Sequence, residues 1–463
     1  MRITTASTRA CDRCYQLKER CQRVPNTSSC ERCQRLSQVC STVRPVRPTC
    51  RRTNRREKRA SNLSSLSSSG MDSMHHVGLW LQETPDLSSE EKELLAYLLS
   101  DSQILHYSVI SPRFKDAEQQ SFLGLLPAAW PILKDAYLAY AGVLKSLHPE
   151  NTAKESNDSH LRRVTSAMMA LRNLPITTAQ DAELCLNMGF ALAATIHTSI
   201  GTGLSTICHH CLTTTRPFIE SAALPPKTSP KLTFLVLMET MDCLVTRSIP
   251  TLRLPPPTPG LIDPHLGLAL PLLSAYHDLC TLSATLASAP SAAHIPALTS
   301  QLATLHAVAQ SWTPDPPKDF LAVCTPAEAI LLLAQARAYR IALLLLIHRL
   351  QHPFGGARDV QADVWAREVL GELEVAHKVA GAPVRCVELP FLIAAVEVRG
   401  RRERERVKGW VGVYVNGGMG AVREAGERFL EGVWEERDRR GEGGMWLEWV
   451  HTPCVVLETL TGG

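Results

Sequence analysis

The sequence predicts a small cysteine-rich module, a basic and serine-rich linker without order, and a large all-α domain. Six of the first forty residues are cysteines, and they fall in two segments that nearly repeat each other. From about Val77 onward, apolar residues recur at helical spacing between Pro- and Gly-rich breaks, and no set of strand-like segments appears. We expect a disordered N-terminus at 1–10, the module at 11–44, the arm and linker at 45–76, and the all-α domain at 77–463.

Charge is distributed unevenly along the 463 residues. Residues 1–60 contain 16 Lys and Arg against 4 Asp and Glu, whereas the rest of the chain is acidic overall. A basic segment attached to an acidic body indicates a polyanionic partner for that segment alone. The first ten residues lack the apolar core of a secretory signal, and the cysteine count of 15 is odd. We therefore expect reduced cysteines and no disulfide framework.

The regular cysteines predict a binuclear metal cluster. The spacing is C-x2-C-x6-C-x8-C-x2-C-x6-C, formed by Cys11, Cys14, Cys21, Cys30, Cys33 and Cys40. A structural zinc ion takes four tetrahedral ligands, so two separate ions would need eight sulfurs. If two thiolates bridge the metals, six cysteines supply all eight bonds. The pattern therefore predicts two Zn2+ per chain.

Each half of the repeat also predicts one short helix. Two cysteines three residues apart lie on one side of a helical turn, and Asp12 and Glu31 stand where such a helix would begin. Leu17 and Leu36 occupy equivalent positions and are candidates for an apolar contact between the halves. A segment this short cannot bury enough surface to fold alone, so metal binding must supply most of its stability.

Residues Ala10 to about Arg44 closely resemble the fungal six-cysteine binuclear zinc-cluster DNA-binding domain. The resemblance implies that Cys11 and Cys30 are the bridging ligands. It also implies a nuclear transcription factor whose first helix enters the major groove of double-stranded DNA at a CGG-like triplet. Two departures are Tyr15, where many members have Arg, and the early position of Pro25 in the loop between the halves.

The resemblance also suggests which side chains contact DNA. Lys18 occupies the position of the family's base-contacting lysine, and a lysine there can donate to guanine acceptors in the major groove. Its equivalent in the second half is Ser37, so only the first half is equipped for base contacts. Arg20 and Arg23 match positions that bind phosphate, which position a module without specifying sequence.

The segment after Cys40 is basic and then serine-rich. Arg51 to Arg59 is a dense basic run that could be a phosphate-binding arm, a nuclear-import signal or a solvated linker. We favour the first two together, with Arg51 and Arg52 as phosphate contacts. Ser61 to Gly70 shows no apolar heptads, so dimerisation through the linker has no support and the oligomeric state stays open.

The large domain is predicted to consist of helices. Ser88 and Glu91 form a capping box before Leu94, Leu95, Leu98 and Leu99. The further predicted helices are Pro131–Leu147, Leu161–Asn173, Ala179–Thr198, Leu232–Thr246, Gly267–Leu286, Pro326–Leu350, Ala362–Ala380, Arg401–Val415 and Val422–Arg439. The most apolar run, Ala329 to Ile347, is interrupted by Arg337 and Arg340, which favours a buried helix over a membrane span.

Candidate chemistry in this domain is sparse. Cys208-His209-His210-Cys211 has no second ligand pair nearby in sequence, so we favour a plain helix over a zinc site. Arg399 to Arg406 mixes charges at helical spacing, as solvated helix faces do. No acid–base or nucleophile constellation appears, and we expect neither an enzyme nor a membrane protein.

These patterns favour a sequence-specific DNA-binding regulator of transcription. Asp181 to Phe218 faintly resembles the helical regulatory region of fungal zinc-cluster regulators, which implies a regulatory or effector-responsive domain rather than a catalytic one. Transcriptional coregulators are candidate partners. A metabolic or secondary-metabolite gene cluster is a plausible target. Two alternatives stay open: a chromatin or corepressor adaptor whose zinc module contacts protein, and an enzyme carrying a DNA-targeting module.

Overall fold

The structure is a computed structural model in which the chain divides into two compact units, Met1–Ser69 and Gly70–Gly463. The described residues are 10–11, 14, 21–22, 29–41, 84, 86–100, 109–146, 157–199, 204–221, 230–288, 293–352, 354, 359–415 and 420–440. In the first unit, the described regular element is the short helix α2 (Glu31–Arg35), which begins at the residue predicted to start it.

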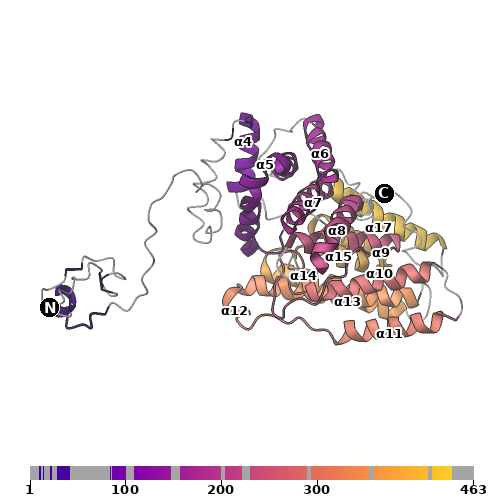
Figure 1. Cartoon of the computed structure of the whole chain (residues 1–463). Coiled ribbons are helices and arrows are strands. Elements are labelled where there is room, and N and C mark those ends of the chain that lie inside the picture. Colours follow the sequence, from indigo (N-terminus) through magenta and orange to yellow (C-terminus); the bar gives the residue numbers. More distant parts are fainter. Residues whose placement is uncertain are drawn as a thin grey trace. The chain divides into compact units, whose positions relative to one another are not determined.

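The second unit is built from helices, as the sequence predicts (Figure 1). Its helices are α4 (Ser89–Ser100), α5 (Lys115–Ser146), α6 (Asn157–Arg172), α7 (Ala179–Ser199), α8 (Leu204–Glu220), α9 (Pro230–Thr246), α10 (Leu273–Ala287), α11 (Ile295–Ser311), α12 (Phe320–Val323), α13 (Pro326–Gln351), α14 (Asp359–Ala380), α15 (Glu388–Val396), α16 (Arg401–Tyr414) and α17 (Gly420–Arg440), with the 3-10 turns η2 (Pro112–Phe114) and η3 (Leu270–Leu272). Within the described part of this unit, β pairing is limited to one isolated bridge, between Asp263 and Gly267.

The predicted capping box is present at the start of α4. The N–H of Ser88 donates to Glu91 Oε2 at 2.9 Å, and the N–H of Glu91 donates to Ser88 Oγ at 3.2 Å. These two bonds satisfy donors that the first turn of a helix leaves without partners. The four leucines predicted to share one face are all buried: Leu94, Leu95, Leu98 and Leu99.

Helix α5 begins well before the predicted Pro131 and passes through Pro127 and Pro131. A proline inside a helix removes one hydrogen bond and costs about 3 kcal/mol, which is why the sequence suggested a break. Phe122, Leu126 and Trp130, four residues apart, are all buried against the core. Burial of this continuous apolar face offsets the cost of the prolines, which sequence spacing alone did not reveal.

The predicted helix Gly267–Leu286 starts too early, because α10 begins at Leu273. Gly267 has φ +54°, outside the helical region, and closes a tight loop with Asp263. Asp263 Oδ1 accepts the N–H groups of His265 and Leu266, each at 2.8 Å. The carboxylate therefore holds a turn where apolar periodicity suggested the first helical turn.

Helices α11 and α15 were not predicted. In α11 the buried residues Leu298, Leu302, Leu305 and Ala309 follow helical spacing, so the sequence does contain a signal for this helix. Helix α15 is buried from Leu389 to Val396, and a helix that is apolar all round has no periodicity to detect.

Helix α13 is a largely buried helix of the second unit and contains the run Ala329 to Ile347. By length and composition it could cross a membrane, but 72% of its most apolar 18-residue window is buried inside the protein. It packs against α11, α14 and α15. The prediction of a buried helix is therefore confirmed.

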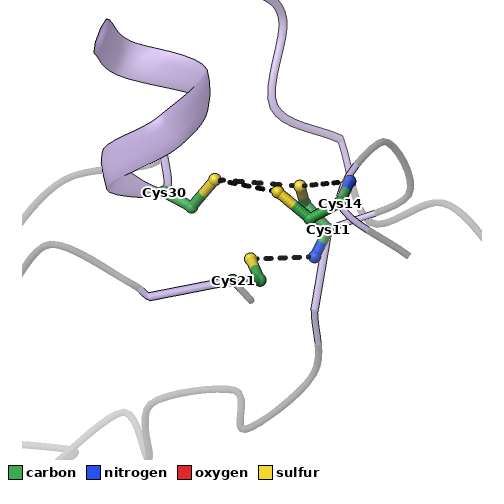
Figure 2. Close-up of side chains that lie close together, drawn as sticks. All are labelled: Cys11, Cys14, Cys21 and Cys30. Carbon is green, nitrogen blue, oxygen red and sulfur yellow. Dashed lines mark hydrogen bonds between the residues drawn. The ribbon is translucent and has the colours of Figure 1, made fainter. Parts of the chain in front are cut away.

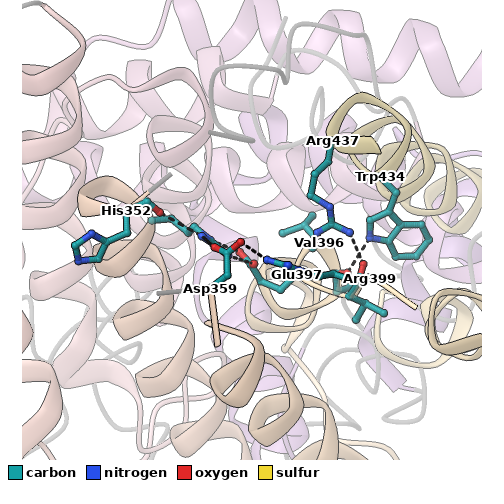
Figure 3. Close-up of polar contacts among 10 residues, drawn as sticks. His352, Asp359, Val396, Glu397, Arg399, Trp434 and Arg437 are labelled. Atoms are coloured by element: carbon teal, nitrogen blue, oxygen red, sulfur yellow. Dashed lines mark hydrogen bonds and ion pairs between the residues drawn. The ribbon is translucent and has the colours of Figure 1, made fainter. Parts of the chain in front are cut away.

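A buried ion network joins α13 to α14 and α15 (Figure 3). Arg349 on α13 is fully buried and donates through Nε to Glu397 Oε1 at 2.8 Å and through Nη1 to Asp359 Oδ1 at 2.6 Å. Desolvation opposes the charge of Arg349, but Glu397 and Asp359 outweigh it and raise the pKa of the guanidinium. Arg399, at the surface, pairs with the other oxygen of Asp359.

The same region fastens α17 to the end of α15. Trp434 Nε1 donates to the carbonyl of Ala395 at 3.1 Å, and Arg437 Nη1 donates to that of Val396 at 2.7 Å. The last carbonyls of a helix have no partners within it, and a cation there also suits the helix dipole. Burial lowers the pKa of Arg437 to about 10, so it remains charged at neutral pH.

Candidate metal centre

The two halves of the cysteine repeat make the same hydrogen bonds from backbone N–H groups to cysteine sulfurs. The N–H of Cys11 donates to Cys21 Sγ at 3.3 Å, and the N–H of Cys30 donates to Cys40 Sγ at 3.3 Å. Within each C-x2-C pair, the second cysteine donates its N–H to the first sulfur, at 3.4 Å and 3.5 Å. Figure 2 shows the first half and Cys30, which lies at the N-terminal end of α2. The two halves therefore hold their sulfurs in the same way.

The six sulfurs form two overlapping groups of four. Cys11, Cys14, Cys21 and Cys30 make one group, and Cys11, Cys30, Cys33 and Cys40 make the other; within each, all sulfurs lie within 4.8 Å of one another. Cys11 and Cys30 belong to both groups, and their sulfurs are 3.8 Å apart.

The sulfur distances suit tetrahedral metal coordination. Cys11 Sγ lies 3.8 Å from Cys33 Sγ, and Cys14 Sγ lies 3.7 Å from Cys30 Sγ. A tetrahedron with zinc–sulfur bonds of about 2.3 Å has edges of about 3.8 Å. Thiolate sulfur is a donor suited to zinc and to other soft metal ions. The cluster can therefore hold a metal ion.

The protonation of the cluster also singles out the two shared cysteines. Desolvation acts to raise the pKa of Cys30, but donation from the N–H and thiol of Cys33 and from neighbouring thiols lowers it to about 6. The pKa of Cys11 is lowered in the same way. Desolvation, with repulsion from these two thiolates, raises the pKa of the remaining four: Cys14, Cys21, Cys33 and Cys40. A bound cation would remove that repulsion and favour the thiolate form of all six.

Ser37 has a role that the sequence did not suggest. It adopts the left-handed conformation, with φ +49°, directly after the C-cap of α2. The N–H of the following residue, Gln38, donates to the carbonyl of Cys33 at 2.8 Å, which closes the helix end. The chain then turns back toward Cys40. Glycine is the usual residue at such a position, and its absence left no signal to find.

Leu36, predicted to take part in an apolar contact between the halves, is 47% exposed. Leu17 lies outside the described residues, as do Asp12 and the five predicted DNA contacts: Lys18, Arg20, Arg23, Arg51 and Arg52. In the described part of this unit, the cysteines occupy the buried centre.

The second cysteine–histidine segment lies in the middle of α8. Cys208 and Cys211 are buried in the core, whereas His209 is mostly exposed and its Nδ1 lies 3.1 Å from Oε1 of the buried Glu239. Among the described residues, both groups of metal-ligand side chains belong to the N-terminal cysteines. The described cysteines are not joined by disulfides. The charged segment of α16 is mostly exposed, as expected of a solvated face.

The first unit contains a cysteine cluster that can hold a metal ion, and the second unit is a helical domain. Residues 154–454 match the family model described as the fungal specific transcription factor domain, about two thirds of the chain. The chain therefore belongs to this family of transcription regulators. The match covers the helical body from before α6 to beyond α17, and the cysteine cluster N-terminal to it agrees with a fungal zinc-cluster factor. No curated protein and no solved structure matches the chain.

Proposed function

We propose that this regulator binds DNA sequence-specifically in the nucleus through a binuclear zinc cluster of its six N-terminal cysteines. The observation that carries the proposal is the pair of overlapping four-sulfur groups that share Cys11 and Cys30. That arrangement supports two Zn2+ per chain, with Cys11 and Cys30 as bridging ligands and the other four cysteines as terminal ligands. Zinc in such a site is structural, and it supplies the stability that so small a core lacks.

The DNA contacts divide into base contacts and phosphate contacts. Lys18 donates to guanine acceptors of a CGG-like triplet in the major groove, and this contact selects the sequence. Arg20 and Arg23 bind the backbone beside it, and Arg51 and Arg52 in the basic arm add affinity that does not depend on sequence. The helical body regulates transcription through coregulators, and membership of a transcription factor family argues against catalysis.

The test is binding of the full-length, zinc-loaded chain to an array of double-stranded DNA sites, before and after chelation. We expect enrichment of CGG-containing sites that disappears when zinc is removed. Zinc-dependent folding without any base preference would contradict the proposal and would favour the adaptor hypothesis, in which the module contacts protein. Zinc content measured on the same sample establishes whether two ions are bound.

A further inference from the structure

Helices α10 and α11 line a cleft that the proposed function does not use. Together with Arg253, which precedes α10, they surround a space of about 590 Å³. In its lining, Ala275, Leu282 and Leu305 are buried, whereas Val308 is 51% exposed, so the cleft is reached from the surface. Sites for small molecules in proteins have volumes of about 300–1,000 Å³ and combine an apolar wall with a few polar groups. The cleft therefore has the size and the lining of a small-molecule site.

The pair of opposite charges in the cleft is neutral as a unit. Arg253 Nε donates to Asp278 Oδ1 at 2.7 Å, and Arg253 Nη2 donates to Oδ2 at 2.9 Å. Desolvation acts to raise the pKa of Asp278, but the Arg253 and His277 side chains beside it lower it to about 2. Both members of the pair are thus ionised at neutral pH. An anionic ligand would compete with Asp278 for the guanidinium, and a cationic ligand would compete with Arg253 for the carboxylate.

The hydroxyl groups of the lining have already used their hydrogen atoms. Ser274, Thr281 and Thr304 each donate to a backbone carbonyl three or four residues earlier, at 3.2 Å, 3.1 Å and 3.0 Å. A hydroxyl group has one donor and two acceptor lone pairs, so these three present acceptors to the cleft. The chemical groups that complement them are hydrogen-bond donors.

We propose that the cleft between α10 and α11 binds an uncharged small molecule with an apolar framework that carries hydroxyl groups. The framework packs against the apolar lining, and the ligand hydroxyls donate to the three side-chain oxygens. The neutral Arg253–Asp278 pair selects against a charged ligand of either sign. This site belongs to the helical body, so it can be tested separately from DNA binding by the cysteine module.

The first test uses the full-length, zinc-loaded wild-type chain and three probes with the same framework. Naphthalene-2,7-diol has two donors, its dimethyl ether has none, and naphthalene-2,7-dicarboxylate is an anion. By equilibrium dialysis we expect the diol to bind at least about tenfold more tightly than either of the other two, because only the diol is uncharged and can donate to the cleft. No variant is needed for this comparison.

The second test removes the acceptors at nearly constant volume. The double substitution Thr281→Val and Thr304→Val should weaken binding of the diol about tenfold and leave binding of the ether unchanged. Thr285→Val with Thr299→Val is the matched control, because these threonines lie on the same two helices, donate to their own helix in the same way and do not line the cleft. Val308→Trp should instead fill the cleft and weaken both probes more than about tenfold.

Four results would overturn the proposal. They are no binding of the diol up to roughly 1 mM, binding of the ether or the dicarboxylate as tight as that of the diol, undiminished binding of the diol by the Thr281→Val/Thr304→Val chain, and undiminished binding by Val308→Trp. DNA binding measured on the same wild-type sample tests the proposed function independently, so the failure of one proposal leaves the other standing.

Discussion

The buried side chains of the two units differ in kind. In the described part of the first unit they are the cysteines Cys11, Cys14, Cys30 and Cys33, whereas the core of the second unit is dominated by Leu, Ala, Val and Ile. Sulfurs 3.7–3.8 Å apart repel one another as thiolates unless a bound cation neutralises them, whereas the helical body is stabilised by packed apolar surface. The two units should therefore lose stability through different changes: the first through loss of its cysteines or metal, and the second through loss of its buried packing and ion pairs.

The buried charges of the body sharpen this contrast. In the first unit, thiolates are placed close together for a metal ion to neutralise. In the second, Arg349 already neutralises Glu397 and Asp359 from within the protein. The body therefore needs no external ion at this network, whereas we expect the module to need a metal ion to fold.

The largest expected effect comes from removing a shared cysteine. Cys30→Ala deletes a sulfur from both groups, so the module should lose both zinc ions and all DNA binding. Cys40→Ala, which affects one group only, should retain about one ion per chain. Zinc analysis of the purified chains measures this, and two ions retained in Cys30→Ala would refute the bridging role.

A substitution in the buried ion network should instead lower the stability of the helical body and leave the zinc content of the module unchanged. Arg349→Met leaves two buried carboxylates without their central cation and should cost about 3–5 kcal/mol of unfolding free energy. Arg337→Met, which breaks only the exposed pair with Glu372, should cost less than about 1 kcal/mol.

Tryptophan fluorescence during urea unfolding reports on the body alone, because all eight tryptophans lie beyond residue 69. Zinc content of both arginine variants should equal that of the wild type. A loss of zinc in Arg349→Met would show that the two units are coupled, and equal stability of the two variants would contradict the role of the network.

A smaller effect is expected within the module at Lys18. Lys18→Ala removes donors to guanine and should reduce discrimination between CGG and mutated triplets by ~1–3 kcal/mol, with zinc content unchanged. Ser37→Ala, at the equivalent position of the second half, is the control and should leave the ranking of sites intact. An unchanged ranking in Lys18→Ala would exclude base contact by this residue.

The smallest effect should come from the basic arm. Replacing Arg51 and Arg52 by Ala removes two phosphate contacts and should lower the slope of log affinity against log salt by roughly two units. All DNA sites should weaken alike. Titrations at several salt concentrations measure the slope, and a loss confined to one sequence would contradict the assignment.

Most helices of the body could be predicted because their apolar residues alternate with polar ones at helical spacing. The failures have specific causes. The first half of α5 was hidden by Pro127 and Pro131, whose cost only the packing of Phe122 and Trp130 offsets. Helix α15 has no polar face to create a period, and the loop at Gly267 depends on a side-chain carboxylate that periodicity does not register.

The candidate site was predictable to a greater degree than the fold around it. Ligand number, ligand type and the repeat of the two halves are all local properties, so spacing alone pointed to two overlapping groups of sulfurs. Ser37 was missed because its left-handed turn is required by the path back to Cys40, which spacing does not describe.

The sequence by itself determined the order of the units, the six candidate metal-ligand cysteines, the helical class of the body and the distribution of charge. These follow from short-range chemistry: the valence of a metal ion, the period of a helix and the number of ionised side chains. Only the tertiary structure decided which charges are buried together, how α17 closes the end of α15, and which side chains of α10 and α11 line one cleft. Those features depend on contacts between residues far apart in the chain, such as Arg349 and Glu397. The spacing of residues within one segment does not predict such contacts.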